Sequence, residues 1–452
     1  MSAIAGAILL WSLSAHAQTS PATGPVTVEA LAEALKSADA DVRREARQAL
    51  IEIGSPSAMA VAPLLKEKDP LVRFRAAGVL AQLGPAAREA LSELLQAMDD
   101  HDNDVRYRAT WAMRHFGDDP RVVGALSAAL LDRVYWIRSE AAEVLAGFGR
   151  GALPSLPWLI EALPLTRSTA HALAGIGPEA VEPLRVALED VNPDARQHVL
   201  AAMAKMRPPP VEALDQIARA LRDEDASVRA EAAGALGASG AAAAPVAHEL
   251  AGAMRDPDPW VRITALRAAG QIGPLARSVA GAVLRAMEDA QPQVRWHAGA
   301  ALNRIGADPS LAVAALSAAV SDRDPMVRMG AALHLGEYGP KAQAAVPALR
   351  PALADPILAV RIAAATALID VGVEPRVVLP ALVEVASLGD LMSMSARVAA
   401  IRQVARLGSA AASAAPVLRR AMEDPVEQVR QAAQEALARI GRPATGPTTS
   451  PL

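Results

Sequence analysis

The sequence has 452 residues, of which 52% are hydrophobic but only 3% are aromatic, so its apolar surface comes mainly from Ala, Leu and Val. A formal net charge of −4 excludes a globally cationic chain of the kind that holds nucleic acid by its overall charge. The absence of cysteine excludes disulfides, thiolate metal sites and cysteine nucleophiles.

Residues 1–17 predict a secretory signal peptide. Residues 4–13 form an apolar core, and Ala15-His16-Ala17 supplies the small-x-small pattern of a cleavage site. Because no Lys or Arg precedes the core, an uncleaved N-terminal anchor is the alternative, although the core is too short for an ordinary membrane span. We expect export to the periplasm or the extracellular space, or a cytoplasmic location if the segment is not a signal. Residues 18–28 are expected to form a linker.

A single motif recurs thirteen times within residues 29–441. The segments DPLVRFRAAGVLAQLG, ending at Gly84, and DPWVRITALRAAGQIG, ending at Gly273, both have Val-Arg and then Gly eleven residues after the Arg. Spacings between these register positions run from 28 to 36 residues, and five consecutive spacings equal 33. Thr166 holds the register position in the fifth repeat, and the other twelve hold arginine: Arg43, Arg73, Arg106, Arg138, Arg196, Arg229, Arg262, Arg295, Arg328, Arg361, Arg397 and Arg430.

Each repeat predicts a first helix, A, and a second helix, B. Helix B often begins with Asp-Pro or Asn-Pro, because the side chain caps free N–H groups and Pro suits the first helical position. A left-handed Gly ends helix B in twelve repeats, and Arg207 replaces it in the sixth. Several A helices carry an early Pro, which bends the helix or marks its first turn. The caps are Asp69-Pro70, Asn192-Pro193, Asp258-Pro259 and Asp324-Pro325, and the helix A prolines are Pro63, Pro347, Pro380 and Pro416.

The motif Asp-x-x-Val-Arg-x-x-Ala-Ala-x-x-Leu-x-x-x-Gly resembles the HEAT repeat family, specifically the short bacterial HEAT repeats that also occur in phycobilin lyase subunits. The resemblance covers residues 29–441. It implies an all-α fold, an α-solenoid that winds as a right-handed superhelix of about thirteen HEAT-type helix pairs. It implies little about function, because repeats of this kind serve many partners.

Helix B should present one polar strip. With the register Arg as position zero and about 100° per residue, positions −1, +3, +7 and +10 form an apolar stripe, and small residues at +6 and +8 let neighbouring B helices approach. Positions +2, +5 and +9 remain, and we expect them to line the concave surface with mixed charge. The candidate partner-binding residues on this strip are Arg75, Arg108, Trp111, His115, His171, His198, Arg267, His297 and Arg304.

The third repeat departs most from the pattern. Trp111 occupies a strip position where most repeats have a small or polar residue, and it follows Tyr107 by four residues. An aromatic side chain beside arginine is typical of an interface anchor. We interpret Trp111 as an anchor for a partner, and Tyr107 and Phe74 as packing between repeats.

The recurring register arginines have an architectural interpretation. A planar guanidinium with several donors can bridge Asp side chains and backbone carbonyls of neighbouring repeats. Recurrence in nearly every repeat favours this structural ladder over ligand binding. The strip histidines are spaced poorly for a metal site, because repeats stack about 10 Å apart. We expect no metal and no cofactor.

The pattern breaks between residues 164 and 212. Thr166 replaces Arg, Arg207 replaces Gly, and Pro208-Pro209-Pro210 follow. We predict a hinge or irregularity there, between about six and seven repeats; degeneration of the repeats without mechanical meaning is the alternative. Residues 442–452 are rich in Pro, Thr and Gly and are expected to form a disordered tail.

The sequence favours a non-catalytic scaffold that presents a concave surface to a protein or peptide partner. One alternative is a HEAT-like lyase or lyase-accessory enzyme related to phycobilin lyases, but the chain has no Gly-rich phosphate loop, no HExxH and no Gly-x-Ser-x-Gly. The second alternative is a nucleic-acid-binding HEAT-like protein, which the basic last repeats support and the net charge opposes. We expect no nucleic-acid partner and no integral membrane span beyond the N-terminal segment.

Overall fold

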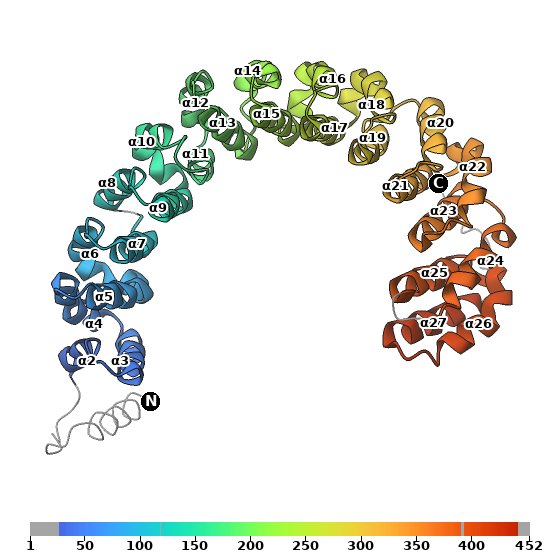
Figure 1. Ribbon diagram of the computed structural model, residues 1–452. Coiled ribbons are helices and arrows are strands. Elements are labelled where there is room, and N and C mark those ends of the chain that lie inside the picture. Colours follow the sequence, from blue (N-terminus) through green and yellow to red (C-terminus); the bar gives the residue numbers. More distant parts are fainter. Residues whose placement is uncertain (1–26, 118, 390–392, 442–452) are drawn as a thin grey trace, which may run out of the picture. The chain divides into compact units, whose positions relative to one another are not determined.

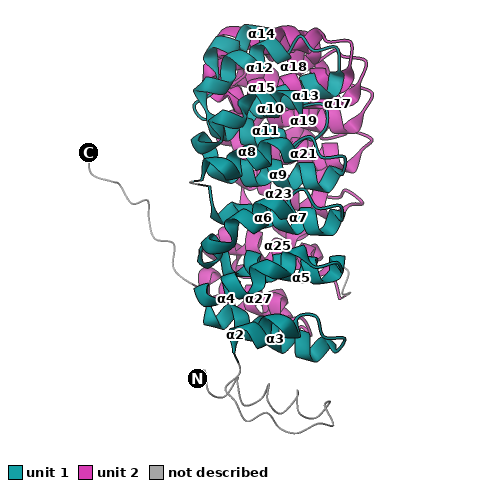
Figure 2. Cartoon of the chain, turned by 90° about the vertical axis from the view of Figure 1, so that its left-hand side faces the viewer, with its two compact units in different colours: residues 1–216 teal, residues 217–452 magenta. Residues whose placement is uncertain are grey.

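The structure is a computed structural model that describes residues 27–117, 119–389 and 393–441 (Figure 1). These residues contain helices and no strand, which confirms the all-α prediction. The chain divides into two compact units, unit 1 with residues 1–216 and unit 2 with residues 217–452 (Figure 2). The predicted signal peptide and the predicted tail at 442–452 lie outside the described residues. Within the described ranges, no helix has the length and apolar character that crossing a membrane requires.

Unit 1 consists of six helix pairs in two layers (Figure 1). The A helices are α2 (Val28–Ala34), α4 (Ser55–Val61), α6 (Leu91–Ala97), α8 (Pro120–Ala129), α10 (Leu156–Glu161) and α12 (Val181–Ala187). The B helices are α3 (Ala40–Ile53), α5 (Pro70–Leu83), α7 (Asn103–Ala112), α9 (Tyr135–Phe148), α11 (Thr169–Ile176) and α13 (Pro193–Lys205). Consecutive B helices pack against one another, as α5, α7, α9 and α11 do.

Unit 2 repeats this arrangement with seven further B helices. Its A helices are α14 (Leu214–Arg219), which contains the boundary between the units, α16 (Leu250–Ala253), α18 (Ala280–Ala286), α20 (Pro309–Ala319), α22 (Val346–Ala352), α24 (Pro375–Ala386) and α26 (Ala415–Ala421). Its B helices are α15 (Ala226–Ala238), α17 (Pro259–Ile272), α19 (Pro292–Arg304), α21 (Pro325–Tyr338), α23 (Leu358–Val371), α25 (Met394–Arg406) and α27 (Glu427–Ile440). The described residues thus contain the thirteen helix pairs of the predicted α-solenoid.

Short 3-10 segments extend many of the helices. Within the described ranges, nine of them lie between a B helix and the next A helix: η2 (Gly84–Ala90), η3 (Met113–His115), η4 (Gly149–Ser155), η5 (Pro178–Ala180), η6 (Val211–Ala213), η8 (Gly240–Glu249), η9 (Gly273–Val279), η10 (Gly339–Ala345) and η12 (Gly408–Ala414). Two others, η1 (Ala62–Lys66) and η7 (Ala220–Arg222), follow A helices. Pro347 and Pro416 begin the α-helical part of their A helices, whereas Pro380 lies inside α24.

The predicted caps begin the B helices. The Asp258 carboxylate accepts hydrogen bonds from the N–H groups of Trp260 and Val261, and Pro259 is the first residue of α17. Asp69, Asn192 and Asp324 cap α5, α13 and α21 in the same way. Because Pro has no N–H to satisfy at this position, the cap and the Pro together define where helix B starts.

Glycine ends the B helices for a stricter reason than the predicted left-handed cap. Gly273 has φ 76° and ψ −145°, a region almost closed to residues that carry a Cβ. Gly372 has φ 90° and ψ 27°, which is left-handed. The predicted cap conformation is therefore right for Gly372 and wrong for Gly273.

This difference predicts unequal costs of substitution. Gly273→Ala should lower the free energy of unfolding by about 1–3 kcal/mol, because the new Cβ is strained in that region. Gly372→Asn should cost less than about 1 kcal/mol, because Asn tolerates the left-handed conformation. Urea unfolding followed by circular dichroism measures both, and equal losses would contradict the assignment of the two conformations.

Small residues at position +8 let neighbouring B helices approach, as predicted. A Cβ added to Gly237 of α15 would lie 2.9 Å from Cα of Ala268 in α17. A Cβ added to Gly336 of α21 would lie 3.3 Å from Cα of Ala367 in α23. These B helices therefore contact each other almost backbone to backbone, which excludes water between the repeats.

The register arginines connect each repeat to the next. Nη1 of Arg73 donates to the carbonyls of Glu67 and Lys68 in its own repeat, and Nε and Nη2 donate to the carboxylate of Asp100 in the next repeat. The carboxylate of Asp100 also accepts a hydrogen bond from the N–H of Asp102. One carboxylate therefore binds both the Arg73 guanidinium and the backbone of the loop before α7. The same ion pair recurs in Arg106–Asp132, Arg229–Asp256, Arg262–Asp289, Arg295–Asp322, Arg328–Asp355 and Arg397–Asp424. We call these seven pairs the arginine–aspartate ladder.

Other register arginines use different acceptors. Arg361 pairs with Glu384 at 2.8 Å. Arg43, Arg196 and Arg430 donate to backbone carbonyls of the loop before their own helix B. Nη2 of Arg138 lies 3.4 Å from the carbonyl oxygen of Leu165, in the repeat that lacks a register arginine.

The fifth repeat has a shortened helix B. Helix α11 has 8 residues, whereas α9 has 14, and Thr166 is buried in the loop before α11. The boundary between the two units falls at Gln216, shortly after the irregular stretch at 164–212. The hinge itself stays a prediction, which limited proteolysis would test by cleavage within this stretch.

Candidate functional site

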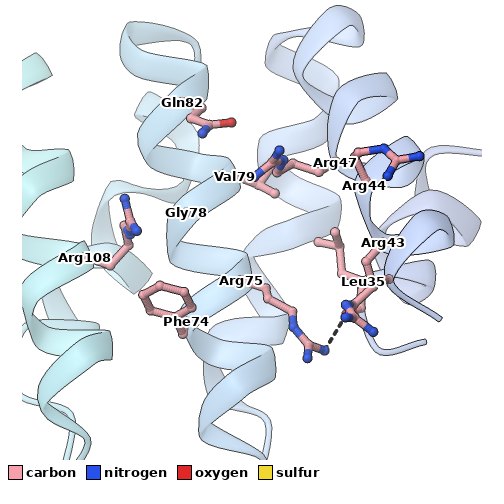
Figure 3. Close-up of a pocket in the computed structure, with 11 residues that line it drawn as sticks. Leu35, Arg43, Arg44, Arg47, Phe74, Arg75, Gly78, Val79, Gln82 and Arg108 are labelled. Atoms are coloured by element: carbon pink, nitrogen blue, oxygen red, sulfur yellow. Dashed lines mark hydrogen bonds between the residues drawn. The ribbon is translucent and has the colours of Figure 1, made fainter. Parts of the chain in front are cut away.

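A pocket of about 360 Å³ opens on the B helices of the first three repeats, within unit 1 (Figure 3). We call it the arginine pocket. None of its eleven lining residues is acidic, and five are arginines. The lining residues are Leu35, Ala40, Arg43, Arg44, Arg47, Phe74, Arg75, Gly78, Val79, Gln82 and Arg108.

Helix α5 forms the floor of the pocket. Phe74, Gly78 and Gln82 follow one another at four-residue spacing, so they lie along one side of the helix. A Cβ added to Gly78 would meet no atom within 4 Å, which leaves open space above this part of the floor. Val79 and Leu35 add apolar wall beside it.

Two of the five arginines already make hydrogen bonds or an ion pair with neighbouring residues of the chain. Arg43 donates to the carbonyls of Ser37 and Ala38. Arg44 forms an exposed ion pair with Asp41, three residues earlier on α3, at 2.6 Å. These side chains contribute positive charge to the pocket, but most of their contacts are local.

The other three arginines keep donors available. Nη1 of Arg75 donates to the Leu35 carbonyl at the end of α2, at 3.1 Å (Figure 3). Arg47 is exposed and makes no hydrogen bond or ion pair with any described residue. The Arg108 guanidinium lies 4.9 Å from the centre of the Phe74 ring, and its buried Nε has no hydrogen-bond partner among the described residues. The pocket therefore holds guanidinium groups without the carboxylates that accompany those of the ladder.

Trp111 and His115 continue this surface along α7 and η3. The Trp111 ring lies 5.8 Å from the Arg108 guanidinium and 4.6 Å from that of Arg114, and it meets His115 edge to face at 6.3 Å. Burial, followed by the positive charge of Arg114, lowers the pKa of His115, which favours the neutral ring. The structure thus brings Arg75, Arg108, Trp111 and His115 together, with Trp111 half-buried.

The two remaining predicted residues of unit 1 lie elsewhere. His171 on α11 is exposed and lies 3.5 Å from Glu143 on α9. Nδ1 of His198 on α13 lies 2.6 Å from the Leu163 carbonyl oxygen, a contact that ties it to the chain. At least one nitrogen of the His198 ring therefore contacts the backbone of the preceding repeat.

Arg267, His297 and Arg304 form a separate group in unit 2. Burial, followed by the charges of Arg267 and Arg304, lowers the pKa of His297. The His297 ring meets Trp296 edge to face at 4.7 Å. Within the parts of the chain that the structure describes, no three His, Cys, Asp or Glu residues lie close enough to hold a metal ion.

Arg44, Arg47 and Gly78 belong to the pocket but not to the predicted set. Arg47 is at position +4, where the neighbouring repeats have the buried residues Ala77 and Thr110. Arg44 and Arg47 are accessible because no B helix precedes α3 among the described residues. An arginine at a position where most repeats have a small or apolar residue is the signal that could have identified this site.

Many solved structures share the fold, among them those of karyopherins. Karyopherin Kap121p bound to the extreme C-terminus of the protein phosphatase Cdc14p matches with a TM-score of 0.64 at 14% identity, covering 92% of this chain and 53% of that chain. Kap121p in another crystal structure matches with a TM-score of 0.62 at 15% identity, covering 96% and 53%. Kap95p, in a structure concerned with RanGDP, matches with a TM-score of 0.62 at 13% identity, covering 91% and 66%. The chain spans about half to two thirds of the length of these proteins, and at such identities the likeness shows the fold alone.

No curated protein matches the sequence. The family model for HEAT repeats matches residues 28–114, 57–146, 91–174, 181–252, 246–316 and 312–391, which is more than half of the chain. The finer likeness to the repeats of phycobilin lyases stays a prediction. With its ladder, its capped B helices and these matches, the chain belongs to the HEAT repeat family.

Proposed function

We propose that this protein is a non-catalytic scaffold whose B helices bind a protein partner, and that the arginine pocket is one of the contacts. The observation that carries the proposal is the cluster of Arg47, Arg75 and Arg108, which keep donors available on an accessible helical surface. Stacked helix pairs present such surfaces to partners along their length. Kap121p, which shares the fold, has been solved with a segment of Cdc14p bound, which supports the same use of the fold.

The pocket offers binding chemistry rather than reaction chemistry. Its lining contains no Ser, Thr, Cys, His, Asp, Glu or Tyr, the side chains that supply nucleophiles or general acids and bases. Guanidinium groups stay protonated and act by hydrogen bonding and charge. This favours a scaffold over the lyase alternative.

Site-specific photo-crosslinking tests the proposal. A photo-reactive phenylalanine analogue replaces Gln82, which lies in the pocket, in the full chain expressed in its native cells (Figure 3). The matched control replaces Gln96, an exposed glutamine on α6 in the layer of A helices. We expect a discrete protein adduct from position 82 and none from position 96; equal labelling from both, or no adduct from position 82, would contradict the proposal.

Export belongs to the proposal as well, because it decides which partners the scaffold meets. The prediction comes from residues 1–17 of the sequence. Cell fractionation with N-terminal sequencing of the purified protein tests it. A chain that starts at Gln18 and lies outside the cytoplasm is expected, and an intact N-terminus in the cytoplasm would contradict export.

A further inference from the structure

We infer that the arginine pocket takes an acidic segment of the protein partner, in which a carboxylate meets Arg47, Arg75 and Arg108 and an adjacent apolar side chain packs on Phe74. The inference rests on the proposed function and specifies its ligand. It follows from the available donors, the missing counter-charge, the apolar floor and the charges around the pocket.

Three arginines of the pocket have N–H donors that no described residue uses. A guanidinium carries five N–H groups. Arg75 uses one nitrogen for the Leu35 carbonyl, and Arg108 and Arg47 make no hydrogen bond to a described residue. Nε of Arg108 is buried, so the donors that this guanidinium offers to a ligand are those of Nη1 and Nη2, and the Phe74 ring lies 4.9 Å from the guanidinium. A carboxylate is the side-chain group that best matches such planar donors, because it accepts two parallel hydrogen bonds.

The arginines of the ladder in the same chain have carboxylate partners. In the ladder, Nε of Arg73 lies 2.6 Å from the carboxylate of Asp100. In the pocket, five guanidinium groups line one cavity that has no acidic lining residue, and of these five Arg44 has a carboxylate partner, Asp41, outside the lining. Like charges at short range repel, and an anion that enters the cavity removes this repulsion. The pocket therefore favours a ligand that carries a carboxylate, whereas in the ladder the chain itself provides the carboxylate.

The pocket also has an apolar surface that a ligand can cover. Phe74, Val79 and Leu35 line the pocket together with Gly78, above which the space is open. The volume of about 360 Å³ lies at the lower end of the range for ligand pockets, about 300–1,000 Å³. A simple inorganic anion would leave this apolar surface uncovered, whereas a peptide with an apolar residue beside the acid would cover it.

Acidic residues on the neighbouring helices favour an acidic peptide over nucleic acid as the ligand. Glu45 and Glu52 lie on α3 beside the pocket, and Glu143 lies two B helices beyond α5, on α9. A nucleic acid carries charge at every nucleotide and would meet these carboxylates as it left the pocket. A peptide can place its acid in the pocket and neutral or basic residues against the glutamates, so charge complementarity favours the peptide.

The test uses the glycine of the floor. Gly78→Glu places a carboxylate on the chain itself, within the pocket, and Gly78→Gln is the matched control of the same size. Both should fold, because a Cβ at Gly78 meets no atom and Gly is unfavourable inside a helix. The probe is a fluorescein-labelled decapeptide of alternating glutamate and leucine, followed by fluorescence anisotropy with the full chain. A glutamine–leucine decapeptide and an oligo-deoxythymidylate of the same length are the comparison probes.

We expect the glutamate–leucine peptide to bind, to weaken as salt is added, and to lose about tenfold or more in affinity with Gly78→Glu. Gly78→Gln should lose no more than about threefold. Arg75→Gln with Arg108→Gln should lose affinity like Gly78→Glu. Circular dichroism and thermal unfolding check that each variant is folded.

Three results would overturn the inference. Equal affinity of the wild type and Gly78→Glu would place the peptide elsewhere. Tighter binding of the oligonucleotide would identify a nucleic-acid site instead. Absence of peptide binding, while Gln82 still crosslinks to a protein, would refute the acidic ligand and leave the proposed function standing.

Discussion

Asp322→Ala is expected to lower the free energy of unfolding by about 3–5 kcal/mol, because it leaves a buried guanidinium without its counter-charge. Arg295 and Asp322 form the ion pair at 2.7 Å, with side chains 6% and 13% exposed. Asp322 also accepts the N–H of Asp324, which caps α21. The substitution therefore removes the bond between two repeats and loosens the start of a helix.

Urea unfolding measures the loss, and hydrogen exchange shows where it falls. We expect the amides of α19, α20 and α21 to lose protection first, because each repeat contacts mainly its neighbours. Asp41→Ala is the matched control, since its ion pair with Arg44 has side chains 71% and 63% exposed and should contribute less than about 1 kcal/mol. Equal losses for the two substitutions would show that the ladder does not hold the repeats together.

Acid is expected to unfold the protein through the same ladder. Burial alone would raise the pKa of Asp100, Asp132, Asp256, Asp322 and Asp355, but hydrogen bonds from a guanidinium and from a backbone N–H hold each pKa below its usual value. Their folded pKa thus lies below the unfolded value of about 3.9. The stability that these groups contribute is complete above about pH 4 and is lost as the pH falls through the folded pKa.

The free energy of unfolding, measured in urea at a series of pH values, tests this expectation. A plateau near neutral pH should give way to a steep decline in acid, because five carboxylates take up protons on unfolding. Asp322→Asn cannot titrate at that position, so its decline should be shallower than that of the wild type. An unchanged stability down to strongly acidic pH would contradict the lowered pKa values.

The sequence was sufficient to predict the helix pairs and their ends. The register of Arg and Gly counts the thirteen repeats, and Asp258-Pro259 shows where a B helix begins. These features depend on residues close together in the chain. The conformation of Gly273 was not predictable in the same way. Its φ of 76° is compatible with a left-handed or an extended ψ, and the path of the chain into the next A helix decides between the two.

The candidate site was only partly predictable. Arg75 and Arg108 follow from the predicted polar strip, where both occupy position +2. Arg47 was missed because position +4 is covered by a preceding B helix in most repeats, and only the three-dimensional stack shows that α3 has none among the described residues. His198 is on the predicted strip, yet its ring contacts a carbonyl in another repeat, which depends on how the repeats stack.

Arginines that lie on adjacent helices have two different roles. Arg73 on α5 holds Asp100 with side chains 15% and 11% exposed, whereas Arg47 on α3 is exposed and makes no bond to a described residue. Ladder arginines stabilise the stack, and the arginines with available donors in the pocket bind. The distinction predicts unequal effects on the free energy of unfolding for substitutions of the same chemistry.

The direct test is the free energy of unfolding of Arg73→Gln beside that of Arg47→Gln, measured in urea under identical conditions. Arg73→Gln should lose about 3 kcal/mol or more, since the buried Asp100 carboxylate loses its guanidinium. Arg47→Gln should stay within about 0.5 kcal/mol of the wild type, as expected for an exposed residue without partners. Equal losses, or a larger loss for Arg47→Gln, would contradict the separation of ladder and pocket.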